Sequence, residues 1–165
     1  MVQGTDRIVS RKNRGFSLIE LVIVIVIIGI ISAIAIPRMT RGANNAGSTA
    51  LKGNLAVLRS AIELYRAEHE GRFPTEAGIA SQLTQYTKMD GTGAAAAPDT
   101  ATGVIYGPYM RAIPPLPVGT NKGDAGIAAA DAATIGWIYT AATGVIKANL
   151  PDTDLDQDGV KFNAY

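Results

Sequence analysis

A single carboxylate lies near the start of a long apolar run, where it needs a partner. The run Phe16–Ile36 contains 21 residues, and Glu20 is its only charged residue. A carboxylate inside a membrane-spanning helix costs about 2.5–3.5 kcal/mol on insertion scales, so it is interpreted first as functional. If the chain is cut after Gly15, Phe16 gains a free α-amine one helical turn from Glu20. We predict that Glu20 pairs with this amine, in its own chain or in a neighbour's, and acts as a docking device.

A second group of carboxylates lies close to Tyr165. Asp154, Asp156 and Asp158 precede Gly159 in the pattern D-x-D-x-D-G, which begins calcium loops of the EF-hand type. Oxygen ligands at alternate positions can surround one hard cation, so the three aspartates are candidate Ca²⁺ ligands. An EF-hand also needs a bidentate glutamate at position twelve, where this sequence has Tyr165. The alternative is a solvated acidic segment that promotes solubility.

The residue types that most catalytic sites need are scarce. The sequence has no cysteine and one histidine, His69, which lies between two glutamates and is expected to be solvated. No nucleophile–base pair, zinc cluster or phosphate-binding loop can be identified, so we predict that the chain is not an enzyme. The formal net charge of +1 gives no broad basic surface, and no nucleic acid is expected as a partner.

The apolar run has the length and composition of a membrane span. As a helix it measures about 31 Å, which matches a hydrocarbon core of about 30 Å. Residues 1–15 carry four basic residues and one acidic residue, a net charge of +3 that favours a cytoplasmic N-terminus. A secretory signal cleaved at Ala33–Ala35 is an alternative, but the run is too long for one and Glu20 interrupts it. An ordinary signal anchor explains the length and gives Glu20 no role.

The stretch KNRGFSLIEL, residues 12–21, resembles the processing site of type IV prepilins and of the pseudopilins of type II secretion systems. The resemblance implies that a prepilin peptidase cleaves between Gly15 and Phe16 and that the new Phe16 amine is methylated. It also implies polymerisation through these helices, with Glu20 neutralising the Phe16 amine of an adjacent subunit. The implied partners are further copies of the chain, the peptidase, a pilus or secretion assembly platform, and the membrane.

The same resemblance sets the expected domain organisation. Residues 1–15 would be a leader peptide, 16–37 the hydrophobic transmembrane and assembly helix, and 38–165 the exported globular domain. The precursor would cross a bacterial inner membrane once, and the mature subunit would enter a periplasmic pseudopilus or an extracellular pilus. Gly29 and Pro37 fall where many members have helix breakers, and we hypothesise that the stretch between them unwinds on assembly.

The exported part is expected to have the pilin fold, of class α+β. Apolar residues recur at spacings of 4, 3, 4 and 3 in Leu51, Leu55, Leu58, Ile62 and Tyr65. This period predicts the amphipathic second half of a helix of about 50 residues, which ends near Gly71 and Pro74.

A short helix and a small antiparallel sheet are predicted to cover this helix. Thr75 can cap a helix of about ten residues that starts at Glu76. Alternating residues in Ile135–Tyr139, the turn TAATG and the return strand Val145–Leu150 predict a β-hairpin with Trp137 in the core. The glycine-rich residues 90–103 are interpreted as a surface loop.

Two classes of function remain open. One is a structural filament subunit, and the other is a monomeric, membrane-anchored, calcium-dependent binding module. A filament could be a surface pilus for adhesion, motility or DNA uptake, or a secretion pseudopilus, with this chain as its major or a minor subunit. Residues 71–83 resemble a segment of major pseudopilins and favour the secretion type. Pro115-Leu116-Pro117 departs from the Asp-Pro-Trp that those proteins often have, which leaves room for a surface pilus.

Overall fold

The computed structural model describes residues 16–165, with only the backbone described at 37–44. It divides into two compact units, the first ending at Thr40 and the second formed by Arg41–Tyr165. The helices are α1 (Leu18–Glu68), α2 (Ile79–Thr84) and a 3₁₀ helix (Phe162–Ala164); the strands are β1 (Gly126–Ala128), β2 (Ile135–Thr140) and β3 (Val145–Ala148). The fold is therefore α+β, as the sequence predicts, and α1 has 51 residues against the predicted 50 or so.

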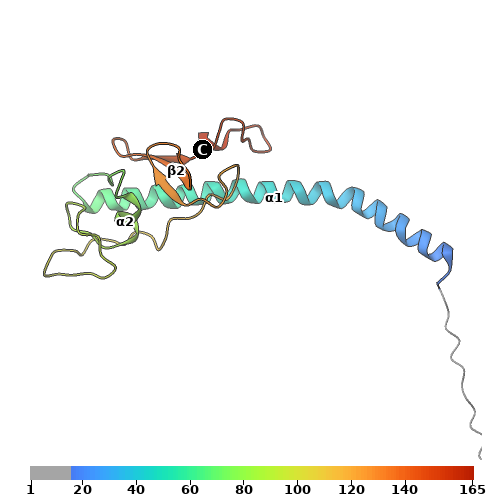
Figure 1. The fold of residues 1–165 in the computed structure, drawn as a ribbon, viewed down its shortest axis with the longest axis horizontal. Helices are drawn as coiled ribbons and strands as arrows, with labels where there is room; N and C mark the ends of the chain where they lie inside the picture. The colour runs from blue at the N-terminus through green and yellow to red at the C-terminus, as the bar shows by residue number, and fades with distance from the viewer. Residues whose placement is uncertain (1–15) are drawn as a thin grey trace, which may run out of the picture. The chain divides into compact units, whose positions relative to one another are not determined.

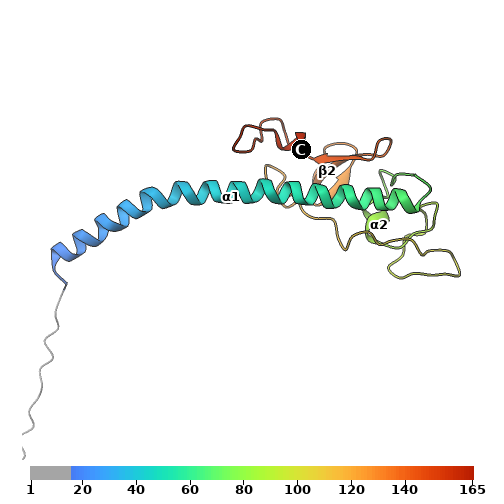
Figure 2. The same cartoon turned by 180° about the vertical axis from the view of Figure 1, so that it is seen from behind.

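The second unit is built on the predicted apolar stripe of α1. All five stripe residues are buried, and they pack against residues of α2, β2 and β3. In Figures 1 and 2 the strand β2 lies on one side of this part of α1 and α2 on the other. Burial of a leucine or isoleucine side chain contributes about 1.5–3 kcal/mol, so this stripe is a main source of the stability of the unit.

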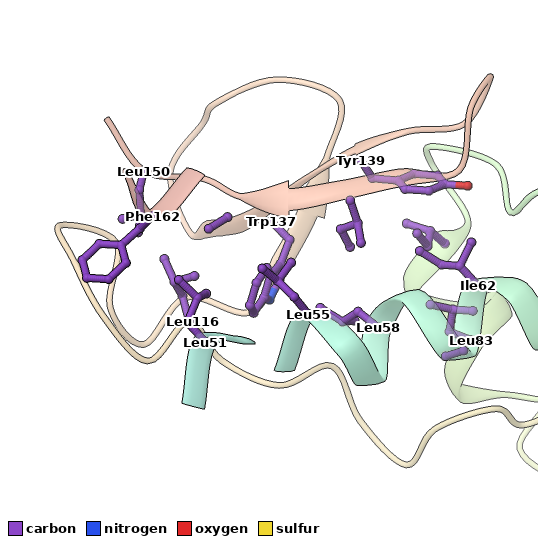
Figure 3. Packing of buried hydrophobic residues seen from close by; sticks show 14 of the residues in the cluster. Leu51, Leu55, Leu58, Ile62, Leu83, Leu116, Trp137, Tyr139, Leu150 and Phe162 are labelled. Carbon is purple, nitrogen blue, oxygen red and sulfur yellow. The ribbon is translucent and has the colours of Figure 1, made fainter. Parts of the chain in front are cut away.

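Trp137 fills the space between the sheet and α1, as predicted. Its ring is fully buried, and Figure 3 shows it between β2 and the helix, close to Leu55. Its indole Nε1 donates a hydrogen bond to the carbonyl of Pro114 at 2.8 Å. Tyr139, on the same face of β2, donates its hydroxyl proton to the carbonyl of Pro74 at 2.9 Å. The two aromatic residues thus bury their rings and still satisfy their polar atoms.

The sheet is mixed rather than wholly antiparallel. Strands β2 and β3 form the predicted antiparallel hairpin, with Tyr139 opposite Ile146. Its turn contains Gly144 at φ 71°, a conformation that favours glycine. Strand β1 pairs with β2 in parallel, with Ile127 opposite Trp137, and this pairing is not predicted. A strand of three residues is too short to show an alternating pattern in the sequence.

The prediction for α2 is wrong in both start and length. The helix has six residues, from Ile79 to Thr84, and begins three residues after Glu76. Thr75 does not cap it directly, because its hydroxyl accepts a hydrogen bond from the Gly78 N–H at 3.1 Å, which holds a turn ahead of the helix. The Thr75 N–H itself donates to the side chain of Gln82 at 2.8 Å. Residues 76–78, which the sequence predicts as the first turn of the helix, therefore form a separate turn ahead of it.

The end of α1 follows the predicted breakers closely. Glu70 and Gly71 have positive φ angles of 57° and 80°, and the Gly71 N–H donates to the carbonyl of Arg66 at 2.9 Å. This bond, from the third residue beyond the helix to its last turn, is that of a Schellman motif. Glu70, rather than a glycine, is the first residue there to take the left-handed conformation.

Candidate functional site

Glu20 lies in the first turn of α1 and has a partner within its own chain. Helix α1 begins at Leu18, and the N–H of Ser17 donates a hydrogen bond to Oε2 of Glu20 at 2.7 Å. Ser17 is the N-cap and Glu20 the third helical residue, so this is one arm of a capping box. The first N–H groups of a helix have no partner inside it, and the helix dipole favours a negative charge there.

The sequence pattern S-x-x-E at 17–20 is the signature of such a capping box, and it is the local signal for this role of Glu20. The carboxylate was expected to pair with the amine of Phe16, in its own chain or in a neighbour's. The structure adds a local function, because Glu20 satisfies a backbone N–H at the start of an apolar helix. Within a bilayer such a group cannot turn to water instead.

The residues around Glu20 form a helical surface without a polar side. Residues Leu18–Ile36 are long and apolar enough to cross a membrane, and the side chains of this window are not buried against the rest of the molecule. Phe16, just before the helix, is 82% exposed. A surface of this kind is stable in lipid or against other apolar helices, and it fits a membrane-anchored precursor.

Three predicted positions accompany Glu20. Gly15, on the N-terminal side of the expected cleavage, lies outside the described residues. Gly29 lies inside α1, and a Cβ added there would meet no atom within 4 Å. Pro37 lies within the backbone of α1 as well. The helix is thus formed across both positions in the single chain, and the hypothesis that it unwinds concerns the assembled filament.

Two of the three aspartates of the candidate calcium site accept hydrogen bonds from separate protein donors. Oδ2 of Asp154 accepts hydrogen bonds from the N–H and the hydroxyl of Thr120, at 2.8 and 2.9 Å. Oδ1 of Asp156 accepts from the N–H groups of Asp158 and Val160, both at 2.8 Å. Among the residues that the structure describes, no three His, Cys, Asp or Glu side chains are grouped as metal ligands would be.

Tyr165 closes the acidic loop instead. Its hydroxyl donates a hydrogen bond to Oδ2 of Asp156. This bond, with those from two backbone N–H groups, lowers the pKa of Asp156, because each favours the ionised carboxylate. The same bond raises the pKa of the Tyr165 hydroxyl to about 12, since the bond is lost when the phenol ionises.

The loop is also fastened to the second half of α1. Nη2 of Arg59 donates to the backbone carbonyl of Tyr165 at 2.5 Å, and the ammonium of Lys52 lies 4.3 Å from the centre of the Tyr165 ring. Lys161 donates to the carboxylate of Asp152 at 2.6 Å, which lowers the pKa of that aspartate. The acidic segment is therefore held by protein donors and cations rather than solvated freely.

His69 is not solvated, and that expectation is wrong. Its side chain is 0% exposed, and its ring stacks on Tyr65 with the ring centres 3.7 Å apart. Nδ1 lies 2.8 Å from the carbonyl of Tyr65 and Nε2 lies 3.0 Å from the hydroxyl of Thr87. A segment distant in the sequence covers the end of α1, and local charge around His69 gives no sign of it.

Comparisons with known proteins find matches that include the N-terminal segment around Glu20. The family model described as a prokaryotic N-terminal methylation motif matches residues 10–36, which include Gly15, Phe16 and Glu20. The type II secretion system core protein G of Pseudomonas aeruginosa is 29% identical over 77 residues, which cover 47% of this chain and 54% of that protein. The core protein G of Klebsiella pneumoniae is 27% identical over 112 residues, or 67% of this chain and 73% of that protein.

A pilin is among the relatives as well. The type IV major pilin protein PilA of Myxococcus xanthus is 40% identical over 73 residues, which cover 43% of this chain and 33% of that protein. The chain thus spans about half the length of the Pseudomonas protein and a third of the Myxococcus one. No solved structure matches the chain. The methylation motif, these relatives and the α+β fold around a long N-terminal helix together support a pilin or pseudopilin family for the chain.

Proposed function

We propose that the chain is a structural subunit that polymerises through the first half of α1 into a filament of the pilus or pseudopilus type. A prepilin peptidase removes residues 1–15, the amine of Phe16 is methylated, and an assembly platform then draws the subunit from the membrane. The observation that carries the proposal is the Glu20 carboxylate, placed in the first turn of a helix whose first part, Leu18–Ile36, is otherwise apolar on every side. Names of the relatives, a secretion core protein and a major pilin, support it.

The proposed mechanism follows from the electrostatics of the bundle. Cleavage leaves a cation at Phe16 in surroundings where an unpaired charge is costly. The same holds for a second copy, so each amine is neutralised by the Glu20 carboxylate of a neighbour. Contacts of this head-to-tail kind do not close on themselves, and repeated copies therefore give a helical polymer.

Substitution of Glu20 tests the proposal. Glu20→Gln keeps an amide oxygen that can accept from the Ser17 N–H, and it removes the negative charge. We expect the variant to insert in the membrane and to lose its leader, while the yield of filaments in electron micrographs falls to background. Glu63→Gln, an exposed change of the same kind in the second unit, is the matched control. Filaments from Glu20→Gln in normal number would contradict the proposal.

Shearing of cells before electron microscopy distinguishes the two possible locations of the filament. A surface pilus is released from cells by shearing, whereas a pseudopilus stays in the periplasm. The proposal covers both, because the relatives include proteins of each type.

Calcium binding by the acidic loop stays a prediction. Asp154, Asp156 and Asp158 would have to exchange their present hydrogen bonds for a shared cation, and only the D-x-D-x-D-G pattern supports this. The prediction expects a calorimetric Ca²⁺ signal and a lower midpoint of thermal unfolding when a chelator is added. Asp158→Asn should remove both effects and Asp99→Asn neither. An unfolding midpoint that is the same with and without chelator, together with no heat of binding, would show it to be wrong.

A further inference from the structure

We draw no further inference here: the strongest candidate, the groove between residues 46–50 of α1, the loop of residues 117–122 and the acidic loop of residues 155–157, is lined in part by the apolar side chains of Val118, Leu155 and Phe162, and nothing in the structure shows what covers it.

Discussion

Glu20 combines two tasks that the same carboxylate can perform. In the single chain it accepts the N–H of Ser17 and completes the start of α1. In the proposed filament Glu20 becomes the counter-ion of the Phe16 amine of a neighbour. In each chain this amine, which cleavage creates, lies one residue before the Ser17 N–H. Because the position already attracts negative charge through the helix dipole, little rearrangement is needed to pass from one task to the other.

The bond between Asp156 and Tyr165 predicts how the acidic loop responds to pH. A carboxyl whose pKa falls on folding stabilises the loop above its unfolded pKa of about 3.9, and this contribution is lost as the pH falls through the lower folded value. The raised pKa of Tyr165, about 12, acts in the other direction: its contribution is complete below about pH 10 and is lost as the pH rises through 12. The loop should therefore be most ordered between these limits.

The amide resonance of Val160 measures this titration, because its N–H donates to Asp156. The midpoint should lie below the ordinary aspartate value in the parent chain. In Tyr165→Phe, which removes the hydroxyl donor and keeps the ring, the midpoint should move up toward that value. The same ordinary midpoint in both proteins would contradict the assigned role of the tyrosine.

At the scale of elements, the periodicity of apolar residues predicted the helix and the hairpin, which are the long and regular elements. The stripe from Leu51 to Tyr65 and the alternation around Trp137 gave α1 and the β2–β3 hairpin, because each pattern repeats often enough to specify a face. Strand β1 and the six-residue α2 depend on pairing and on turns between distant segments, which short local patterns do not record. The burial of His69 is missed for the same reason, since the fold brings Thr87 to it from a segment beyond α2.

The packing of α1 on the sheet predicts a sharp difference between two adjacent residues. Leu58→Ala removes a fully buried side chain and should lower the free energy of unfolding by about 2–5 kcal/mol. Val57→Ala, next to it on the exposed face, should change that free energy by less than about 0.5 kcal/mol. Fluorescence of Trp137, the one tryptophan of the chain, follows urea unfolding of both variants. Comparable losses in the two variants would mean that the assigned faces of α1 are wrong.

At the scale of the whole molecule, the sequence predicted the apolar anchor helix better than it predicted the exported unit, while the chemistry at Phe16 and Glu20 stays a prediction. One contiguous stretch of sequence contains the basic residues, Glu20 and the apolar run. Such a pattern can be recognised without knowledge of the fold. The candidate calcium site is the opposite case, because whether three aspartates converge depends on the loop they occupy. Here Thr120 and Tyr165 engage two of them, and neither contact can be foreseen from the spacing of the acids.

The central claim is that a new amine at Phe16 is the partner of Glu20 in the assembled protein. The most direct measurement is the intact mass and N-terminal sequence of subunits taken from purified filaments. The account predicts a chain that begins at Phe16, with a methylated amine and the apolar segment retained. Subunits that still carry residues 1–15, or that lack the segment from Phe16 to Ile36, would contradict it.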